Sequence, residues 1–150
     1  MKFKFRFQQI LQICLHEENE VKNQLAKKDG QIAEANAEIK KLKDECSQAL
    51  ENKMQDLQRG DMLKLRLYPA YLARLQRSWE FHEEELERLM KQREKIMQEL
   101  LEKRRNRKTY EKMKEKDELA WKKEQQKREQ KNLDEFSNRR SAHLGENSDA

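Results

Sequence analysis

The sequence predicts an all-α protein, a long two-helix antiparallel coiled-coil hairpin, from three observations. First, charged residues make up 42% of the 150 residues and apolar residues only 35%, which is too little apolar surface for a compact globule to offset its chain entropy. Second, glycine occurs three times and proline once, as is typical of long helices. Third, the apolar residues follow a seven-residue repeat with one convincing interruption.

The first arm, about residues 5–58, carries apolar residues at alternating steps of four and three. Eleven of the fourteen positions on this repeat are apolar, whereas chance would fill about five at this composition. The positions are Phe7, Leu11, Cys14, Glu18, Val21, Leu25, Lys28, Ile32, Ala35, Ile39, Leu42, Cys46, Ala49 and Lys53. Such a repeat is typical of the buried seam of a coiled coil. Near its end we expect a stutter that moves the seam to Leu50, Met54 and Leu57.

The second arm, about residues 70–140, has the same repeat, and its apolar character thins after Leu100. Its positions are Leu75, Trp79, His82, Leu86, Leu89, Arg93, Ile96, Leu100, Lys103, Arg107 and Tyr110. On the outer face, acidic residues precede basic ones by four positions, and each such pair adds about 0.3 kcal/mol to helix stability. These pairs are Glu84/Arg88, Glu87/Lys91, Glu99/Lys103, Glu118/Lys122 and Glu124/Arg128. We expect residues 141–150 to form a disordered tail and residues 1–140 a single domain.

The bend between the arms covers about residues 59–69. Gly60 suits the position that follows a helix C-terminus, Asp61 can cap a short turn, and Pro69 suits the first turn of the next helix. Folding back near residue 64 makes the numbers of facing residues add to about 128. The resulting pairs are Leu50 with Trp79, Leu42 with Leu86, Ile32 with Ile96, and Phe7 with Trp121. At 1.5 Å per residue, the second arm extends beyond the first by roughly 30 Å.

The pattern predicts no catalytic, cofactor-binding or metal site, and no enzyme. His16, His82 and His143 lie far apart along the arms, and no spacing of cysteine and histidine matches a metal site. No glycine-rich phosphate loop occurs. Cys14 and Cys46 lie on the seam, where we expect reduced thiols packed as small hydrophobic residues. His82 is expected to be a polar seam residue that helps to set the register.

The N-terminal segment resembles a signal peptide only superficially. Basic residues precede apolar ones, but Gln8, Gln9 and Gln12 interrupt the apolar stretch, and no small-residue cleavage site follows. No run of residues is apolar and long enough to span a membrane. We therefore expect a cytosolic protein that is at most peripheral to a membrane.

The two ends of the predicted hairpin carry clusters of basic, aromatic and apolar residues that a simple coiled coil does not require. Residues 103–140 hold fifteen basic and eight acidic residues, a net charge of +7. The N-terminal basic residues Lys2, Lys4 and Arg6 join them when the hairpin closes. Aromatic residues of the same end are Phe3, Phe5, Phe7, Trp121 and Phe136. A basic, aromatic tip suits an acidic socket on a partner, and the alternative is a merely solvated charged face.

The bend carries a second cluster, which is apolar. Its members are Leu65, Leu67, Tyr68, Tyr71, Leu72 and Leu75. Exposed aliphatic and aromatic clusters usually mark contact sites. The alternative is that these side chains only cap the end of the coiled coil.

Three segments resemble the FliJ family, the soluble coiled-coil components of the bacterial flagellar type III export apparatus. They are the opening FKFRFQQIL, the segment YPAYLARLQ after the bend, and EQKNLDEFSNRR at residues 129–140. The resemblance extends over nearly the whole chain. The chain departs from the family at residues 14–16, where it has Cys-Leu-His in place of arginine and glutamate.

The resemblance implies a stalk-like protein with three kinds of partner. The joined termini would insert into the pore of the hexameric export ATPase FliI, and the bend would bind the export gate protein FlhA. Members of the family also escort export chaperones. The residues that match the gate-binding positions are Tyr71, Leu72 and Leu75. The residues that match the ATPase-facing end are Phe3, Arg6, Asp134, Glu135, Phe136 and Arg139.

Three other interpretations remain open at this point. A basic helical hairpin with a pI near 9.1 could bind nucleic acid, although its basic residues are interleaved with acidic ones and no recognition motif occurs. A generic spacer coiled coil is the second interpretation. The third is attachment of the basic end to a membrane.

Overall fold

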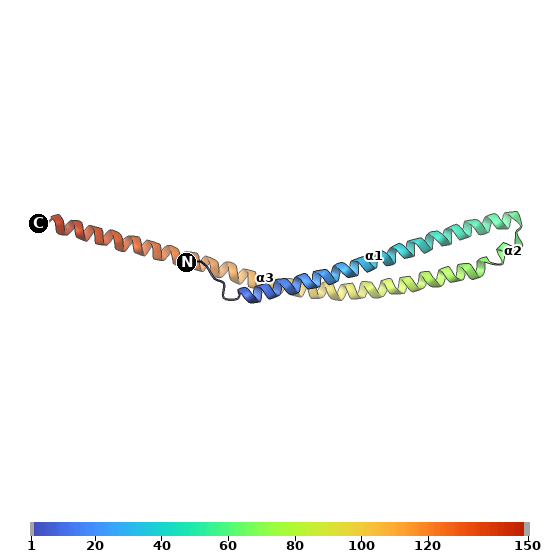
Figure 1. The fold of residues 1–150 in the computed structure, drawn as a ribbon, viewed down its shortest axis with the longest axis horizontal. Coiled ribbons are helices and arrows are strands. Elements are labelled where there is room, and N and C mark those ends of the chain that lie inside the picture. Colours follow the sequence, from blue (N-terminus) through green and yellow to red (C-terminus); the bar gives the residue numbers. More distant parts are fainter. Residues whose placement is uncertain (1, 149–150) are drawn as a thin grey trace. The chain divides into compact units, whose positions relative to one another are not determined.

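The computed structural model describes residues 2–148, with side chains for residues 2–145. The three helices are α1 (Gln8–Arg59), α2 (Met62–Leu65) and α3 (Tyr68–Ser148), and Figure 1 shows α2 between the end of α1 and the start of α3. No strand occurs among residues 2–148. The all-α prediction is therefore confirmed. Helix α3 continues beyond Arg140 to Ser148, where the sequence suggested a disordered tail, because no proline stops it and one glycine costs a helix only about 1 kcal/mol. Residues 149–150 lie outside the described residues.

The contacts divide the chain into two units, where the repeat suggested one domain. Unit 1 combines Met1–His16 with Lys103–Ala150, and unit 2 is Glu17–Glu102. In unit 2, Asp29 of α1 is paired with Arg93 of α3, and Asp56 with Tyr68. Because the partner's number falls as the residue number rises, the two helices run antiparallel. The ring contacts of unit 1 follow the same direction, and the predicted antiparallel helical hairpin is confirmed.

The buried residues of unit 2 form a narrow seam between α1 and α3. The apolar ones are Val21, Ala35, Ile39, Leu42 and Ala49 from α1, and Leu75, Leu89 and Leu100 from α3. All of them lie on the predicted repeat. In unit 1 the buried apolar residues are Phe5, Leu11 and Cys14. Cys46 is half-buried, and both cysteines are free thiols.

The predicted stutter near the end of α1 is wrong. Leu50, Met54 and Leu57 are exposed, and the original repeat continues instead through half-buried Lys53 to buried Asp56. The physical reason is a polar partner across the seam. The Tyr68 hydroxyl donates a hydrogen bond of 2.5 Å to Asp56 Oδ2, so the seam ends on a satisfied carboxylate and the aliphatic residues stay outside.

The bend has the geometry that its residues predict. Gly60 has φ of 71°, the left-handed conformation that glycine adopts without steric cost. Its amide donates to the Leu57 carbonyl at 3.2 Å, and the Asp61 amide donates to the Asp56 carbonyl at 3.1 Å, which together form a Schellman motif. Asp61 Oδ1 then accepts from the Lys64 amide at 3.3 Å and caps α2.

The predicted register is wrong by about one to three helical turns. The symmetrical fold predicts that Trp79 faces Leu50. In the structure the Lys43 ammonium lies 5.1 Å from the centre of the Trp79 ring. The reason is that α2 and the following turn bring Tyr68 level with Asp56, so α3 begins beside the last turn of α1. Each α3 residue consequently meets an α1 residue with a lower number than a symmetrical bend would give.

In unit 1 the register differs further, because the segment before Gln8 is not helical. Phe7 was paired with Trp121, but its ring contacts Tyr110 at 6.2 Å between centroids, while Phe3 contacts Trp121 at 6.0 Å. Extended residues advance about 3.3 Å each and helical residues 1.5 Å. Residues 2–5 lie outside any helix and residues 6–7 form a turn, so Phe3 and Phe7 contact α3 residues that are eleven positions apart.

The outer face of α3 carries the predicted ion pairs in part. Glu87–Lys91, Glu118–Lys122 and Glu124–Arg128 lie at 3.6, 4.0 and 3.7 Å. Arg88 lies 4.0 Å from Glu85 instead of pairing with Glu84. These contacts support a helix that buries little surface.

Candidate functional site

The bend surface of unit 2 contains the three residues predicted to bind the export gate. Tyr71 is exposed, and the Arg74 guanidinium lies 5.6 Å from the centre of its ring. Leu72 is half-buried. Leu75 is buried in the seam, so it supports the surface from below. Of the three side chains, only Tyr71 and Leu72 offer area to a partner.

A hollow of about 400 Å³ adjoins this surface between α1 and α3. Its lining residues are Cys46, Leu50, Leu72, Gln76, Trp79, Glu80 and Glu83. The Trp79 indole donates a hydrogen bond of 2.6 Å to Glu83 Oε1, which fixes the ring in place. An apolar floor with carboxylates at its edge suits an apolar side chain of another protein. The repeat predicts only a seam position for Trp79, although a large amphipathic ring beside exposed aliphatic residues is a signal for a contact site.

The carboxylate of Asp56 anchors the bend to the start of α3. Its hydrogen bond from the Tyr68 hydroxyl raises the pKa of Tyr68, and burial and the charges of Asp56 and Asp61 add to this effect. A raised pKa keeps the phenol protonated and able to donate. The bend surface is thus held to α1 by a side-chain bond as well as by the backbone turn.

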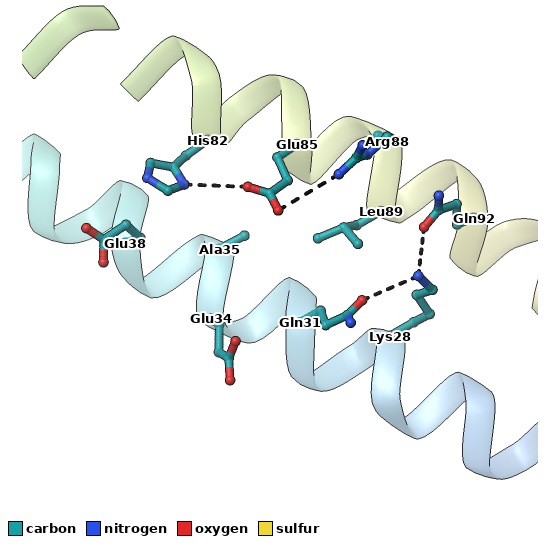
Figure 2. Close-up of a pocket in the computed structure, with 10 residues that line it drawn as sticks. All are labelled: Lys28, Gln31, Glu34, Ala35, Glu38, His82, Glu85, Arg88, Leu89 and Gln92. Atoms are coloured by element: carbon teal, nitrogen blue, oxygen red, sulfur yellow. Dashed lines mark hydrogen bonds and ion pairs between the residues drawn. The ribbon is translucent and has the colours of Figure 1, made fainter. Parts of the chain in front are cut away.

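A second, polar hollow of about 640 Å³ lies further along unit 2, and Figure 2 shows its lining residues. The Lys28 ammonium donates to Gln92 Oε1 across the helices at 2.8 Å and to Gln31 Oε1 at 3.4 Å. His82 Nδ1 lies 3.8 Å from Glu85 Oε2. Next to this hollow, Arg93 Nε lies 2.6 Å from Asp29 Oδ1. The Lys28–Gln92 and Asp29–Arg93 contacts join α1 to α3, whereas His82 and Glu85 both belong to α3.

The terminal surface of unit 1 begins with a cluster of rings. Phe3 is half-buried against Trp121, and the Arg6 guanidinium lies 4.6 Å from the centre of the Phe7 ring. Phe5 and Phe7 meet edge to face at 5.9 Å. The structure thus brings Phe3 and Arg6 into one aromatic cluster. Tyr110 completes it, a residue that the sequence analysis assigned to the seam.

The other predicted residues of the terminal surface lie further along α3. Every side chain from residue 126 to residue 145 is exposed, including Asp134, Glu135, Phe136 and Arg139. Asp134 accepts a hydrogen bond from Gln130 Nε2 at 3.2 Å. Asp134 lies about 20 Å along the helix from Trp121. The six predicted residues therefore form two groups within unit 1 and not one cluster.

The described residues give no sign of a metal site or of a membrane-spanning helix. No group of three or more histidine, cysteine, aspartate or glutamate residues within residues 2–148 could hold a metal ion. Over the same range, no helix is long and apolar enough to cross a bilayer.

These features define a coiled-coil interaction protein, an antiparallel helical hairpin that offers exposed apolar and aromatic side chains to partners. The chain belongs to the FliJ family, because the family described as "Flagellar FliJ protein" matches residues 3–146. The family is a non-catalytic part of the flagellar export apparatus, so the chain is a component of that apparatus and contributes to motility. The comparisons with curated proteins and with solved structures return no match.

Proposed function

We propose that the chain connects the export ATPase to the export gate of the flagellar type III apparatus. The terminal surface of unit 1 binds the central pore of the hexameric ATPase FliI, and the bend surface of unit 2 binds the gate protein FlhA. The chain also escorts export chaperones. It acts in the cytoplasm, peripheral to the cell membrane at the flagellar base. The observation that carries the proposal is the presence of two exposed surfaces of different chemistry on different units.

The terminal surface suits a charged pore. The segment 103–140 has a net charge of +7, and every side chain from residue 126 to residue 145 is exposed. Phe136 is 65% exposed among these charges. Aromatic and arginine side chains dominate the binding energy of protein interfaces, so Phe136 and Arg139 are the anchors we assign to the ATPase ring.

The bend surface suits a protein with an apolar side chain to insert. Leu72 lines the hollow that has Trp79 in its wall, and Tyr71 is the exposed residue that precedes it. The buried Leu75 supports Leu72 from the seam, so its role in gate binding is to hold the surface in shape. The same hollow is the site we assign to the chaperones, because it has the apolar floor that a helix of another protein requires.

A crossed binding experiment tests this proposal. The variants are Phe136→Ala/Arg139→Ala on the terminal surface and Tyr71→Ala/Leu72→Ala on the bend, with exposed Phe81→Ala as the control. We expect the first double variant to bind the hexameric ATPase at least about tenfold more weakly and the gate normally. The second should show the reverse, and the control should bind both partners.

Two results contradict the proposal. Equal loss of both partners in both variants would indicate a general defect of the hairpin and not two surfaces. Tight binding to DNA that weakens steeply with salt, together with no binding to the ATPase, would favour the nucleic-acid interpretation.

A further inference from the structure

We propose that the tip of the bend, residues 59–67, binds the surface of an anionic lipid bilayer by inserting Met62, Leu63 and Leu67. This membrane contact is separate from the gate-binding surface and does not depend on the proposed partners. It also differs from attachment through the basic termini, since the residues belong to unit 2.

The apolar side chains of the tip are exposed to an unusual degree. Met62, Leu63 and Leu67 have 68%, 77% and 71% of their surface in contact with solvent. They follow one another within the short helix α2 and the turn after it, which Figure 1 places at the reversal of the chain. None of them lines the hollow that adjoins Tyr71 and Leu72. The tip therefore presents its aliphatic groups outward to solvent.

The charges around these side chains are complementary to anionic headgroups. Arg59, Lys64 and Arg66 are all exposed. The nearby carboxylates are directed to partners in the bend, since Asp61 caps the Lys64 amide and Asp56 accepts from Tyr68. Basic residues that flank exposed aliphatic residues are the pattern that binds anionic membrane surfaces.

Three backbone amides of the tip have carbonyl partners within the bend. The Asp61 amide bonds to the Asp56 carbonyl, the Leu65 amide to the Asp61 carbonyl, and the Leu67 amide to the Lys64 carbonyl. A backbone group that enters the apolar region without a partner is costly. Because these amides have partners within the bend, the side chains can enter the interface while the local fold is retained. A basic, aliphatic tip of this kind favours a lipid surface over a protein groove.

Sedimentation of the full chain with lipid vesicles tests this inference. The vesicles contain phosphatidylcholine alone or phosphatidylcholine mixed with phosphatidylglycerol. We expect binding to the anionic vesicles only. The variant Met62→Gln/Leu63→Gln/Leu67→Gln should bind them at least about tenfold more weakly. Lys64→Gln/Arg66→Gln should also weaken binding and make it less dependent on salt.

The matched control is Leu119→Gln/Leu133→Gln/Leu144→Gln, which removes three exposed leucines from unit 1. It should bind anionic vesicles as the wild type does, and circular dichroism should show the same helical content in all variants. The inference is overturned if the wild type binds neither kind of vesicle. Equal loss of vesicle binding in the control, or loss of the gate protein alone in the bend variant, would overturn it as well.

Discussion

Asp56 occupies a seam position where the repeat requires an apolar side chain. Burying a carboxylate is costly unless it is hydrogen-bonded, and here the Tyr68 hydroxyl supplies that bond across the bend. At this seam position a directional hydrogen bond between Tyr68 and Asp56 takes the place of an aliphatic contact. At the scale of single residues, this bond determines where α3 begins relative to α1.

The Tyr68–Asp56 bond predicts a characteristic dependence of stability on pH. The folded state raises the pKa of Tyr68 above its ordinary value of 10.0. A group whose pKa is higher in the folded state than in the unfolded state stabilises the fold. This stabilisation is fully present at pH values below the unfolded-state pKa and is lost as pH rises through the folded-state pKa. We expect Tyr68→Phe to lower the thermal midpoint near neutral pH.

The wild type and Tyr68→Phe should then converge as pH rises above about 10. Thermal unfolding followed by circular dichroism between neutral and alkaline pH measures both trends. Parallel curves, with a constant difference at every pH, would show that the phenol's titration has no part in holding the bend.

At the scale of the helix, the end of α1 shows whether the seam keeps its seven-residue repeat or shifts by a stutter. Leu42 is buried and Leu57 is exposed, whereas a stutter would have buried Leu57. We expect Leu42→Ala to lower the free energy of unfolding by about 2–4 kcal/mol, because it leaves a cavity or loses packing. Leu57→Ala should change it by less than about 0.5 kcal/mol. Urea titration of both variants checks this, and a large effect of Leu57→Ala would restore the stutter.

The two glycines of unit 2 predict opposite effects of the same substitution. Neither has an atom within 4 Å of an added Cβ, but Gly60 has φ of +71° and Gly30 lies within α1. Gly60→Ala should destabilise the protein by about 1–2 kcal/mol, because a left-handed residue with a Cβ is strained. Gly30→Ala should stabilise it by about 1 kcal/mol through helix propensity. Thermal or urea unfolding compares them directly, and effects of the same sign would contradict this account.

At the scale of the whole molecule, each unit contains one tryptophan. Trp121 belongs to unit 1 and Trp79 to unit 2, so Trp79→Phe leaves a reporter of unit 1 and Trp121→Phe a reporter of unit 2. We expect unit 1 to unfold at a urea concentration roughly 0.5 M lower, since its α3 side chains from residue 126 to residue 145 are all exposed. Fluorescence titrations of both variants measure the difference. Coincident transitions would show that the chain unfolds as one cooperative unit.

Local signals in the sequence predict most of this fold. The repeat identifies the seam, and Gly60, Asp61 and Pro69 identify the bend, because Gly60 and Pro69 act through their own backbone conformation and Asp61 caps the helix that follows it. The register depends instead on the Tyr68–Asp56 bond and on the non-helical segment before Gln8. Both depend on the tertiary structure, which a sequence repeat does not show. The sequence therefore predicts which faces are buried better than it predicts which residues meet.

The candidate sites are predictable to a smaller extent for the same reason. Leu75 is the kind of apolar residue that often contacts a partner, but its side chain is buried in the seam. The side chain of Tyr71, one helical turn earlier, is exposed. Met62 and Leu63 were not recognised, because a four-residue helix is too short for a pattern to show which side faces outward. The terminal surface is predicted from net charge and aromatic residues, which can be counted in the sequence without the fold.

The left-handed turn at Gly60 has a consequence for how the protein is supplied to the apparatus. A coiled coil made from two separate chains dissociates when its abundance falls below its dissociation constant. Here a covalent turn keeps each arm near its partner, at an effective concentration that dilution does not alter. The pairing of the arms is thus independent of copy number, and a cell that makes only a few molecules still has every one of them assembled.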